Sequence, residues 1–327
     1  MQELKFNIIK VEFPAKFEDI RKLLKKIFDK NVSELKNRHL IFGPANKTTL
    51  LEAQNKIMHQ IAGHSKNFNL FHGASACAQA IKISHALELL ETQTIYSLSN
   101  YINYLFEQAK QNRSKAVKKL ISYPEFTQTN NLINEIIKEK IEHPKLIELK
   151  SLIEDKIKEN PKAKIIVFSQ YRDSVAKICK EIKSLDNTSA EIFIGQAKKT
   201  NGKNQAGLSQ KEQYRTIKEF SEGKFNVLCA TSIGEEGLDI PEVNSVIFYE
   251  PIPSAIRTIQ RRGRTARLMP GELIMLVTKN TRDESYYWSA FHKEKRMQNA
   301  IKSIKDDLIN KTELKSEEIE KEQKTLI

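Results

Sequence analysis

Apolar residues recur at different spacings in the two halves of the chain. Up to about residue 160 they return every three or four positions, which is typical of the buried face of an amphipathic helix. This spacing predicts helices over residues 17–30, 49–63, 76–93, 98–110 and 130–142, and His143-Pro144 breaks the pattern before one more helix begins. FNIIKVEF (6–13) resembles a strand that stops at Pro14. We therefore expect one opening strand followed by a helical bundle.

The spacing changes at Lys164. Short apolar runs rich in β-branched residues follow one another: KIIVFSQ, AEIFIGQ, FNVLCAT, SVIFYEP and ELIMLVTK. Amphipathic stretches that predict helices accompany them, at 172–184, 209–221, 254–262 and 281–300. Strands that alternate with helices in this way indicate a parallel sheet covered on both faces. The second half is thus predicted to be an α/β domain.

Composition limits the class of protein. The 327 residues are 39% hydrophobic, which is enough for two packed domains, and no apolar run approaches the roughly 18 residues of a membrane span. The N-terminus has no apolar signal-peptide segment, so we expect an intracellular, cytoplasmic protein associated with the nucleoid. A net charge of +13 fits a partner with a phosphate backbone. Most basic residues alternate with Glu on helix faces, however, so composition alone leaves nucleic-acid binding open.

Candidate chemistry lies in the loops that follow the strands, where ligands bind in open α/β sheets. These segments are SQYRDS (169–174), ATSIGEEGLDIPE (230–242) and QRRGRTAR (260–267). On a helix, Gln260, Gly263, Arg264 and Arg267 share one face, and guanidinium groups match the oxygens of a phosphoryl group. Taken singly, surface ion pairs explain the arginine run and a plain β-to-α turn explains the glycine-rich loop.

In this order and spacing, the three segments resemble motifs IV, V and VI of superfamily 2 helicases. Together with HPKL, FIGQA, GLSQKEQ and TRDESYYW, they are similar to the archaeal Hef and Fanconi anaemia group M helicases, and KISHALELLETQ resembles the helical insertion domain of that family. The resemblance implies a RecA-like helicase C-terminal lobe with a P-loop NTPase-like fold, preceded by an all-α insertion domain. The implied divisions are 1–16 (linker strand from the first motor lobe), 17–142 (helical, fork-recognition domain), 143–305 (RecA-like domain) and 306–327 (charged tail).

The resemblance also implies roles for individual residues. Those implied to face the ATP γ-phosphate are Gln260, Arg264 and Arg267, with Arg267 at the arginine-finger position, and Gly237 and Asp239 lie beside the nucleotide. Residues implied to contact nucleic acid are Ser169, Gln170, Tyr171, Arg172, Gly195, Gln196, Ser209, Gln210 and Thr231. The sequence departs from the family at Ala266, where glycine is usual.

Walker A and Walker B segments are absent from this sequence. FGPANKTT (42–49) lacks the two required glycines, and Asp283-Glu284 at a helix start is interpreted as a cap pair rather than a metal site. We therefore expect a half motor with no metal ligands of its own, whose ATP and Mg²⁺ are held with a first lobe on another chain or in a removed segment. Its expected substrate is forked or branched DNA.

Other interpretations of the chain and of its parts stay open. The chain could be a non-catalytic nucleic-acid-binding adaptor, or a fragment of an RNA-sensing helicase, which shares the inserted helical domain. Within the helical part, YINYLFEQAKQNRSKAVKKL (101–120) could grip branched DNA or could only contribute to packing. For the aromatic residues Tyr286, Tyr287 and Trp288, packing is favoured over base stacking.

Overall fold

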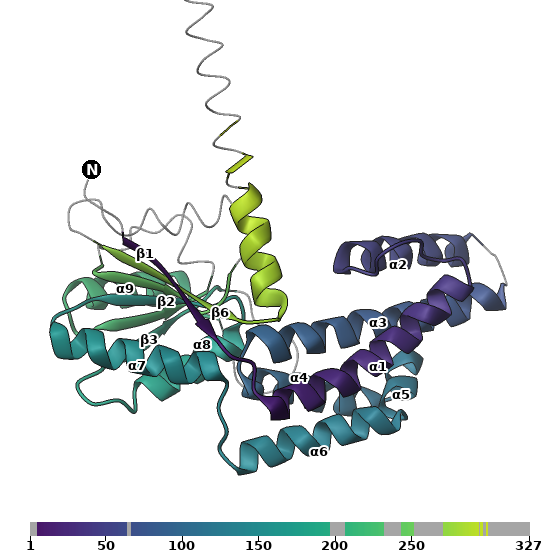
Figure 1. Ribbon diagram of the computed structural model, residues 1–327, viewed down its shortest axis with the longest axis horizontal. Coiled ribbons are helices and arrows are strands. Elements are labelled where there is room, and N and C mark those ends of the chain that lie inside the picture. Colours follow the sequence, from purple (N-terminus) through teal and green to yellow (C-terminus); the bar gives the residue numbers. More distant parts are fainter. Residues whose placement is uncertain are drawn as a thin grey trace, which may run out of the picture.

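Six parallel strands form one sheet in the order β1-β6-β5-β2-β4-β3 (Figure 1). The strands are β1 (Lys5–Val11), β2 (Ile165–Phe168), β3 (Ala190–Phe193), β4 (Val227–Ala230), β5 (Ser245–Phe248) and β6 (Glu272–Thr278). The computed structural model describes residues 5–63, 67–196, 207–231, 243–251 and 271–293, with 295, 296 and 299. The predicted nucleotide-site residues Gly237, Asp239, Gln260, Arg264 and Arg267, and the predicted tail at 306–327, lie outside the described residues.

Helices cover both faces of the sheet because successive side chains of a strand point to opposite sides. Ile165 and Val167 of β2 share a buried cluster with α7 (Pro144–Glu159) and α8 (Arg172–Ile182). Ile166 and Phe168 pack on the opposite face, with α9 (Gln210–Ser221) and Tyr287 of the helix at 282–293. The central strands are buried on both faces, which explains their continuous apolar runs. The predicted α/β fold is confirmed.

The opening strand is part of this sheet. We expected it as a linker from another lobe, and in the structure β1 pairs with β6 along its whole length, from Lys5 opposite Glu272 to Val11 opposite Thr278. The helical domain therefore lies, in the chain, between the edge strand β1 and the rest of the sheet. Both of its chain connections run to the α/β domain.

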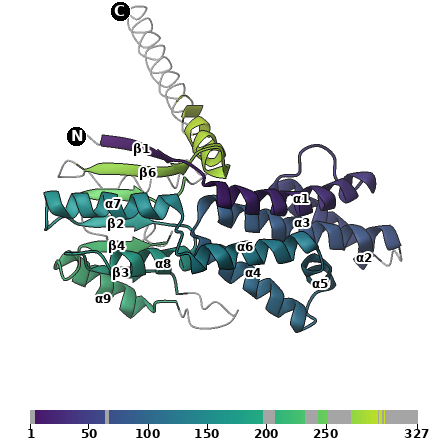
Figure 2. The same ribbon diagram turned by 60° about the horizontal axis from the view of Figure 1, so that its bottom comes forward.

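Six described helices make up the helical domain, which extends away from the carboxyl ends of the strands (Figures 1 and 2). They are α1 (Ala15–Asn37), α2 (Lys47–Ala62), α3 (Phe68–Thr92), α4 (Ile95–Lys110), α5 (Lys115–Ile121) and α6 (Pro124–Lys138). In α1, the fully buried Phe17, Ile20, Leu24 and Ile27 follow the predicted helical spacing. The short helix α5 was not predicted.

The side chains of Cys77, Cys179 and Cys229 are free thiols buried in the described core. In the described parts of the chain, no helix combines the length and the apolar character that a membrane crossing requires. Among those same residues, no group of three or more His, Cys, Asp or Glu side chains is arranged to hold a metal ion.

Candidate nucleic-acid interface

The predicted nucleic-acid residues follow strands whose carboxyl ends lie at one edge of the sheet. Phe168, the last residue of β2, is in register with Ala230 of β4 and Phe248 of β5, and Ala230 is in register with Phe193 of β3. The segments that begin at residues 169, 194, 231 and 249 therefore leave the sheet at the same level. This arrangement follows from the parallel register and needs no further assumption.

Arg172, Gly195 and the start of α9 are brought together by direct contacts. The guanidinium Nη2 of Arg172 donates to the carbonyl oxygen of Gly195 at 2.9 Å. Gly207 packs so closely on this loop that an added Cβ would lie 2.1 Å from the same carbonyl oxygen. The buried amide of Gln213 also donates to Ile194 O at 2.9 Å, which fixes α9 against the loop. Arg172, Gly195, Gln196, Ser209 and Gln210 thus lie close together at this edge of the sheet, where Gln196, Ser209 and Gln210 are exposed and Gly195 is buried. Their contact with nucleic acid stays a prediction.

Ser209 has a local structural role in this surface. Its hydroxyl accepts a hydrogen bond from Glu212 N at 3.3 Å, and the Glu212 carboxylate accepts from Ser209 N at 2.7 Å, which is a complete capping box. The Ser209 hydroxyl also donates to the Glu212 carboxylate at 2.7 Å, and this hydrogen bond, together with the one from Ser209 N, lowers the pKa of Glu212. The next residue, Gln210, is exposed at the N-terminus of α9. The free backbone N–H groups at a helix N-terminus favour phosphate binding, although the Glu212 carboxylate already accepts from one of them, Ser209 N.

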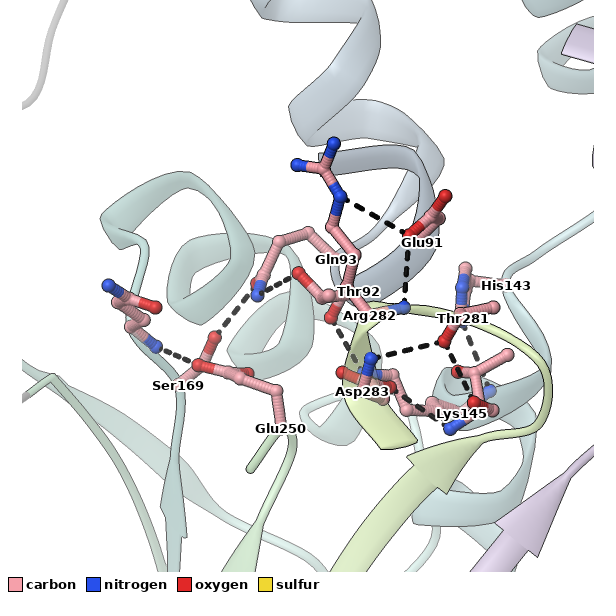
Figure 3. A network of polar contacts seen from close by, with 12 residues as sticks. Glu91, Thr92, Gln93, His143, Lys145, Ser169, Glu250, Thr281, Arg282 and Asp283 are labelled. Atoms are coloured by element: carbon pink, nitrogen blue, oxygen red, sulfur yellow. Dashed lines mark hydrogen bonds and ion pairs between the residues drawn. The ribbon is translucent and has the colours of Figure 1, made fainter. Parts of the chain in front are cut away.

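Ser169 and Tyr171 face the helical domain rather than solvent. Ser169 is fully buried, and its hydroxyl donates to Gln93 Oε1 at 3.2 Å (Figure 3). The Tyr171 ring lies 5.6 Å from the ring of His85, and its hydroxyl is hydrogen-bonded to Glu88. Burial, with the nearby carboxylate of Glu88, raises the pKa of Tyr171. In this conformation neither side chain presents an open hydroxyl to a ligand.

The remaining predicted contacts divide between exposed and buried positions. The side chains of Gln170 and Gln196 are exposed, whereas Thr231 is buried and donates its backbone N–H to Phe193 O at 3.0 Å. The backbone N–H of Gln170 donates to the buried carboxylate of Glu250, the second residue after β5 (Figure 3). Our sequence reasoning missed Glu250, and the available signal was a carboxylate directly after a fully apolar strand in SVIFYEP.

A buried ion pair lies beside this edge, between Lys145 of α7 and Asp283 beyond β6. The Lys145 Nζ to Asp283 Oδ2 distance is 2.7 Å, and both side chains are fully buried (Figure 3). Lys145 Nζ also donates to the carbonyl oxygen of Thr92 at the end of α3, at 2.7 Å. Burial raises the pKa of Asp283, and the charge of Lys145 opposes this effect. One ammonium group therefore joins the helical domain to the α/β domain.

The structure corrects the prediction that Asp283 belongs to a helix-cap pair. The cap is Thr281, whose hydroxyl oxygen accepts from Asp283 N at 3.2 Å. The Asp283 carboxylate points elsewhere and accepts from Thr278 N and Lys145 Nζ. Glu284 accepts from Asn280 N at 3.0 Å, so only this second residue assists the helix start. The sequence could not reveal the partner Lys145, 138 residues away.

Acidic side chains of α3 hold other groups of the α/β domain. Glu91 accepts from Arg282 N at 3.0 Å, and the hydroxyl of Tyr286 lies 3.5 Å from Glu88 Oε1. Burial alone would raise the pKa of Glu88, but the hydrogen bond from His85 and the charge of Lys47 lower it to about 2. The joint between the two domains is thus polar, charged and buried.

The aromatic residues of the segment 101–120 face inward. Tyr101 and Phe106 pack against the helical core, whereas Arg113, Lys115 and Lys118 are exposed. The exposed residues there include these cations, whereas the two rings are partly buried against the helical core. In the helix at 282–293, Tyr287 packs on the sheet as predicted. Trp288 does not follow that prediction fully, because it is 48% exposed and contacts the rings of Tyr287 and Phe291.

Two protein families match consecutive parts of the chain. Residues 144–269 match the family described as "Helicase conserved C-terminal domain", and residues 16–143 match the one described as "Putative ATP-dependent RNA helicase, helical bundle". The junction between the two matches, at residues 143 and 144, falls directly before α7. The second match coincides with the helical domain, and the first covers the α/β domain except for its strands β1 and β6.

Similar proteins include helicases of archaea and fungi. The chain is 37% identical over 304 residues to the Methanocaldococcus jannaschii protein named "Putative ATP-dependent RNA helicase MJ1505", covering 92% of this chain and 37% of that protein. It is 30% identical over 292 residues to the ATP-dependent DNA helicase mph1 of Neurospora crassa, covering 86% and 25%. The chain therefore spans well under half the length of these curated relatives.

A solved structure with the same architecture is the helicase domain of Pyrococcus furiosus Hef. It has a TM-score of 0.73 and 40% sequence identity, and the match covers 88% of this chain and 58% of the Hef chain. The match extends over both the helical and the α/β parts, which confirms the RecA-like fold and the resemblance to Hef. The chain thus consists of a helicase conserved C-terminal domain with a helical bundle, and it is a relative of the Hef and Mph1 helicases.

Proposed function

We propose that this chain provides the second motor lobe of an ATP-dependent DNA helicase or translocase that acts on forked or branched DNA. The observation that carries the proposal is the close arrangement of Arg172, Gly195, Gln196, Ser209 and Gln210 at the strand ends, where Gln196, Ser209 and Gln210 are exposed. Its exposed amide side chains and helix N-terminus suit the sugar-phosphate backbone of a strand, independently of base sequence. The exposed Gln170, two residues beyond the end of β2, lies at the same edge of the sheet.

The nucleotide side of the proposal rests on the motif resemblance. The segment with Gly237 and Asp239 follows β4 directly, and the segment with Gln260, Arg264 and Arg267 follows β5. Both strands flank β2, so both segments start beside the proposed strand-binding surface. We assign Arg264 and Arg267 to stabilising the charge that develops on the γ-phosphoryl group. ATP and Mg²⁺ are held with a first motor lobe, on another chain or elsewhere in the same polypeptide.

The proposal predicts that the arginines act on ATP turnover and not on DNA affinity. Combined with a polypeptide that carries the first lobe of a Hef-type helicase, Arg264→Ala and Arg267→Ala should each lower DNA-stimulated ATP hydrolysis by about a thousandfold or more, the usual contribution of an arginine finger. DNA affinity should change little. The matched control is Arg38→Ala, because Arg38 lies in the helical domain and pairs with Glu34 at 3.2 Å.

An adaptor without ATPase activity is the main alternative. It predicts that the first lobe restores no turnover and that the arginine variants change nothing except DNA affinity. That result would exclude the motor assignment.

RNA is the second candidate substrate, because one relative and one matched family carry RNA helicase in their names. The DNA helicase mph1 and the similarity to Hef favour DNA. Matched forked substrates made of deoxyribonucleotides or ribonucleotides separate the two. Equal or greater stimulation of ATP turnover by the RNA fork would contradict the DNA assignment.

We also propose that the helical domain contributes to fork recognition through its cations rather than its rings. Arg113, Lys115 and Lys118 are exposed on one stretch, while Tyr101 and Phe106 are packed inward. Substituting the three cations by Gln should reduce the preference for forked over linear duplex DNA. An unchanged preference would leave this domain with a packing role only.

A further inference from the structure

The turn between α3 and α4 lies against the carboxyl end of β2 and the start of α8. Gln93 in this turn is fully buried, and its Nε2 donates to Thr92 Oγ1 at 3.1 Å. Its Oε1 accepts from the Ser169 hydroxyl at 3.2 Å. Four residues farther along, Ser97 Oγ lies 2.9 Å from Ser174 Oγ, and both are buried. The helical domain is thus hydrogen-bonded to both ends of the segment 169–174, at Ser169 and at Ser174.

Ser169 and Gln170 are neighbours with opposite environments. Ser169 has no exposed surface, so a nucleic-acid strand could reach its hydroxyl only by displacing Gln93. The Gln170 side chain is exposed, and its backbone N–H is held by Glu250 (Figure 3). The peptide between the two residues is therefore fixed from the helical domain on one side and from β5 on the other. A side chain attached to a doubly fixed backbone needs little ordering when it binds a ligand.

From this arrangement we propose that Gln93 is a positioning residue of the strand-binding surface. It holds Ser169 and, through Ser169, the exposed Gln170, which makes the direct contact with the phosphate backbone. The inference rests on the proposed function and changes one assignment within it, because Ser169 becomes an internal anchor rather than a ligand. The helical domain then forms part of the interface even where it touches no nucleic acid.

The test is a double-mutant cycle on the full chain, with binding of a fluorescent 20-nucleotide single-stranded DNA followed by anisotropy at fixed salt. Gln170→Ala should weaken binding about fivefold, the usual contribution of one hydrogen bond. Gln93→Leu keeps the size of the side chain but removes the acceptor for Ser169, and it should weaken binding by a similar factor. In the Gln170→Ala background, Gln93→Leu should have no further effect, because the contact that it positions is already lost.

Gln79→Leu is the matched control. Gln79 is also a fully buried glutamine of α3, and its amide donates only within that helix, to Ser75 O and Ser75 Oγ at 3.1 Å. This variant changes a buried polar group of the same helical domain that touches no residue of the α/β domain through its amide, and it should leave DNA affinity unchanged. If Gln93→Leu fails to fold, Ser169→Ala breaks the same hydrogen bond from the other side and completes the cycle.

The outcomes separate this inference from the proposed function. A wild-type chain that does not bind the DNA overturns both. If the wild-type chain binds the DNA, two results overturn only the positioning role of Gln93. Either Gln93→Leu does not change DNA affinity, or it lowers the affinity by the same factor in the wild-type and in the Gln170→Ala chain. Loss of affinity that disappears in the Gln170→Ala background supports it.

Discussion

Lys145→Met tests how strongly the two domains are joined. The methionine side chain has nearly the length of lysine, so the substitution removes the ammonium group and leaves most of the packing in place. In the wild-type chain this group donates to Asp283 and to Thr92 O, both at 2.7 Å, and lies 4.8 Å from the ring centre of Tyr249. After the substitution, the Asp283 carboxylate stays buried, with the backbone N–H of Thr278 at 3.0 Å as a remaining donor.

The expected loss is large because the buried Asp283 carboxylate keeps only a neutral donor and loses its opposite charge. Removing one member of a buried, hydrogen-bonded ion pair costs about 3–5 kcal/mol of unfolding free energy. For a chain of this size that corresponds to a fall in melting temperature of roughly 10 °C. The matched control is Lys183→Met, since Lys183 pairs with Glu191 at a similar distance of 2.9 Å but the two side chains are 46% and 50% exposed. An exposed pair contributes about 0–1 kcal/mol.

Urea unfolding followed by circular dichroism and by fluorescence of the single tryptophan, Trp288, measures both losses. Trp288 lies five residues from Asp283 and reports on the helix that carries the carboxylate. Adding Asp283→Asn to Lys145→Met removes the second charge and should recover most of the stability. Equal losses for Lys145→Met and Lys183→Met would refute the reasoning, because the pair could then not be buried.

The pH dependence of the same variant supplies an internal check. Burial raises the pKa of Asp283, and loss of the Lys145 charge should raise it further. A raised carboxyl pKa in the folded state means that stability is present at low pH and is lost as pH rises through that pKa. The deficit of Lys145→Met should therefore be smaller at pH 5 than at pH 8. A deficit that grows on acidification would contradict this sign.

Two further predictions follow from single positions. Gly207→Ala should destabilise the chain by about 1–3 kcal/mol and weaken DNA binding, because its Cβ would lie 2.1 Å from the backbone oxygen of Gly195. In the control Gly63→Ala the nearest contact of the added Cβ is 3.6 Å, so stability and DNA binding should not change. Equal behaviour of the two variants in thermal melting and in DNA-binding anisotropy would refute the close packing of Gly207. The pKa of Glu88 is lowered to about 2, so its ionised carboxylate stabilises the folded state above about pH 4.5. As the pH falls from about 4.5 to about 2, the wild-type chain should lose this stabilisation. Glu88→Gln should lose less over that interval in an acid titration followed by circular dichroism, and a parallel loss in both proteins would count against the ion cluster.

Much of the fold could be predicted from the spacing of apolar residues. The runs that became β2, β4 and β5 are buried on both faces, and their alternation with amphipathic helices is what indicates a parallel sheet between two helical layers. The helix α5 escaped prediction because its seven residues carry too few apolar positions to show a period. The β1 strand was expected, but its pairing with β6 joins residues more than 260 positions apart and has no local signal.

The candidate site was predicted less completely than the fold. The residues Arg172, Gly195 and Ser209, which the motif spacing singled out, lie near one another because the carboxyl ends of parallel strands meet at one edge, and their role stays a prediction. The spacing could not show that Ser169 is buried, because its hydrogen-bond partner Gln93 lies 76 residues earlier in the chain, at the end of a helix of the other domain. The same limit applies to Lys145 and Asp283, where each charge by itself resembles an ordinary surface residue. Long-range polar pairs depend on the tertiary arrangement, which a local pattern does not encode.

The most direct measurement for the half-motor claim is ATP turnover by this chain alone, by a first-lobe polypeptide of a Hef-type helicase alone, and by their mixture, each with and without forked DNA. The account predicts turnover that appears only in the mixture and rises when forked DNA is added. Robust DNA-stimulated hydrolysis by this chain alone, or a mixture no more active than the sum of its parts, would contradict it.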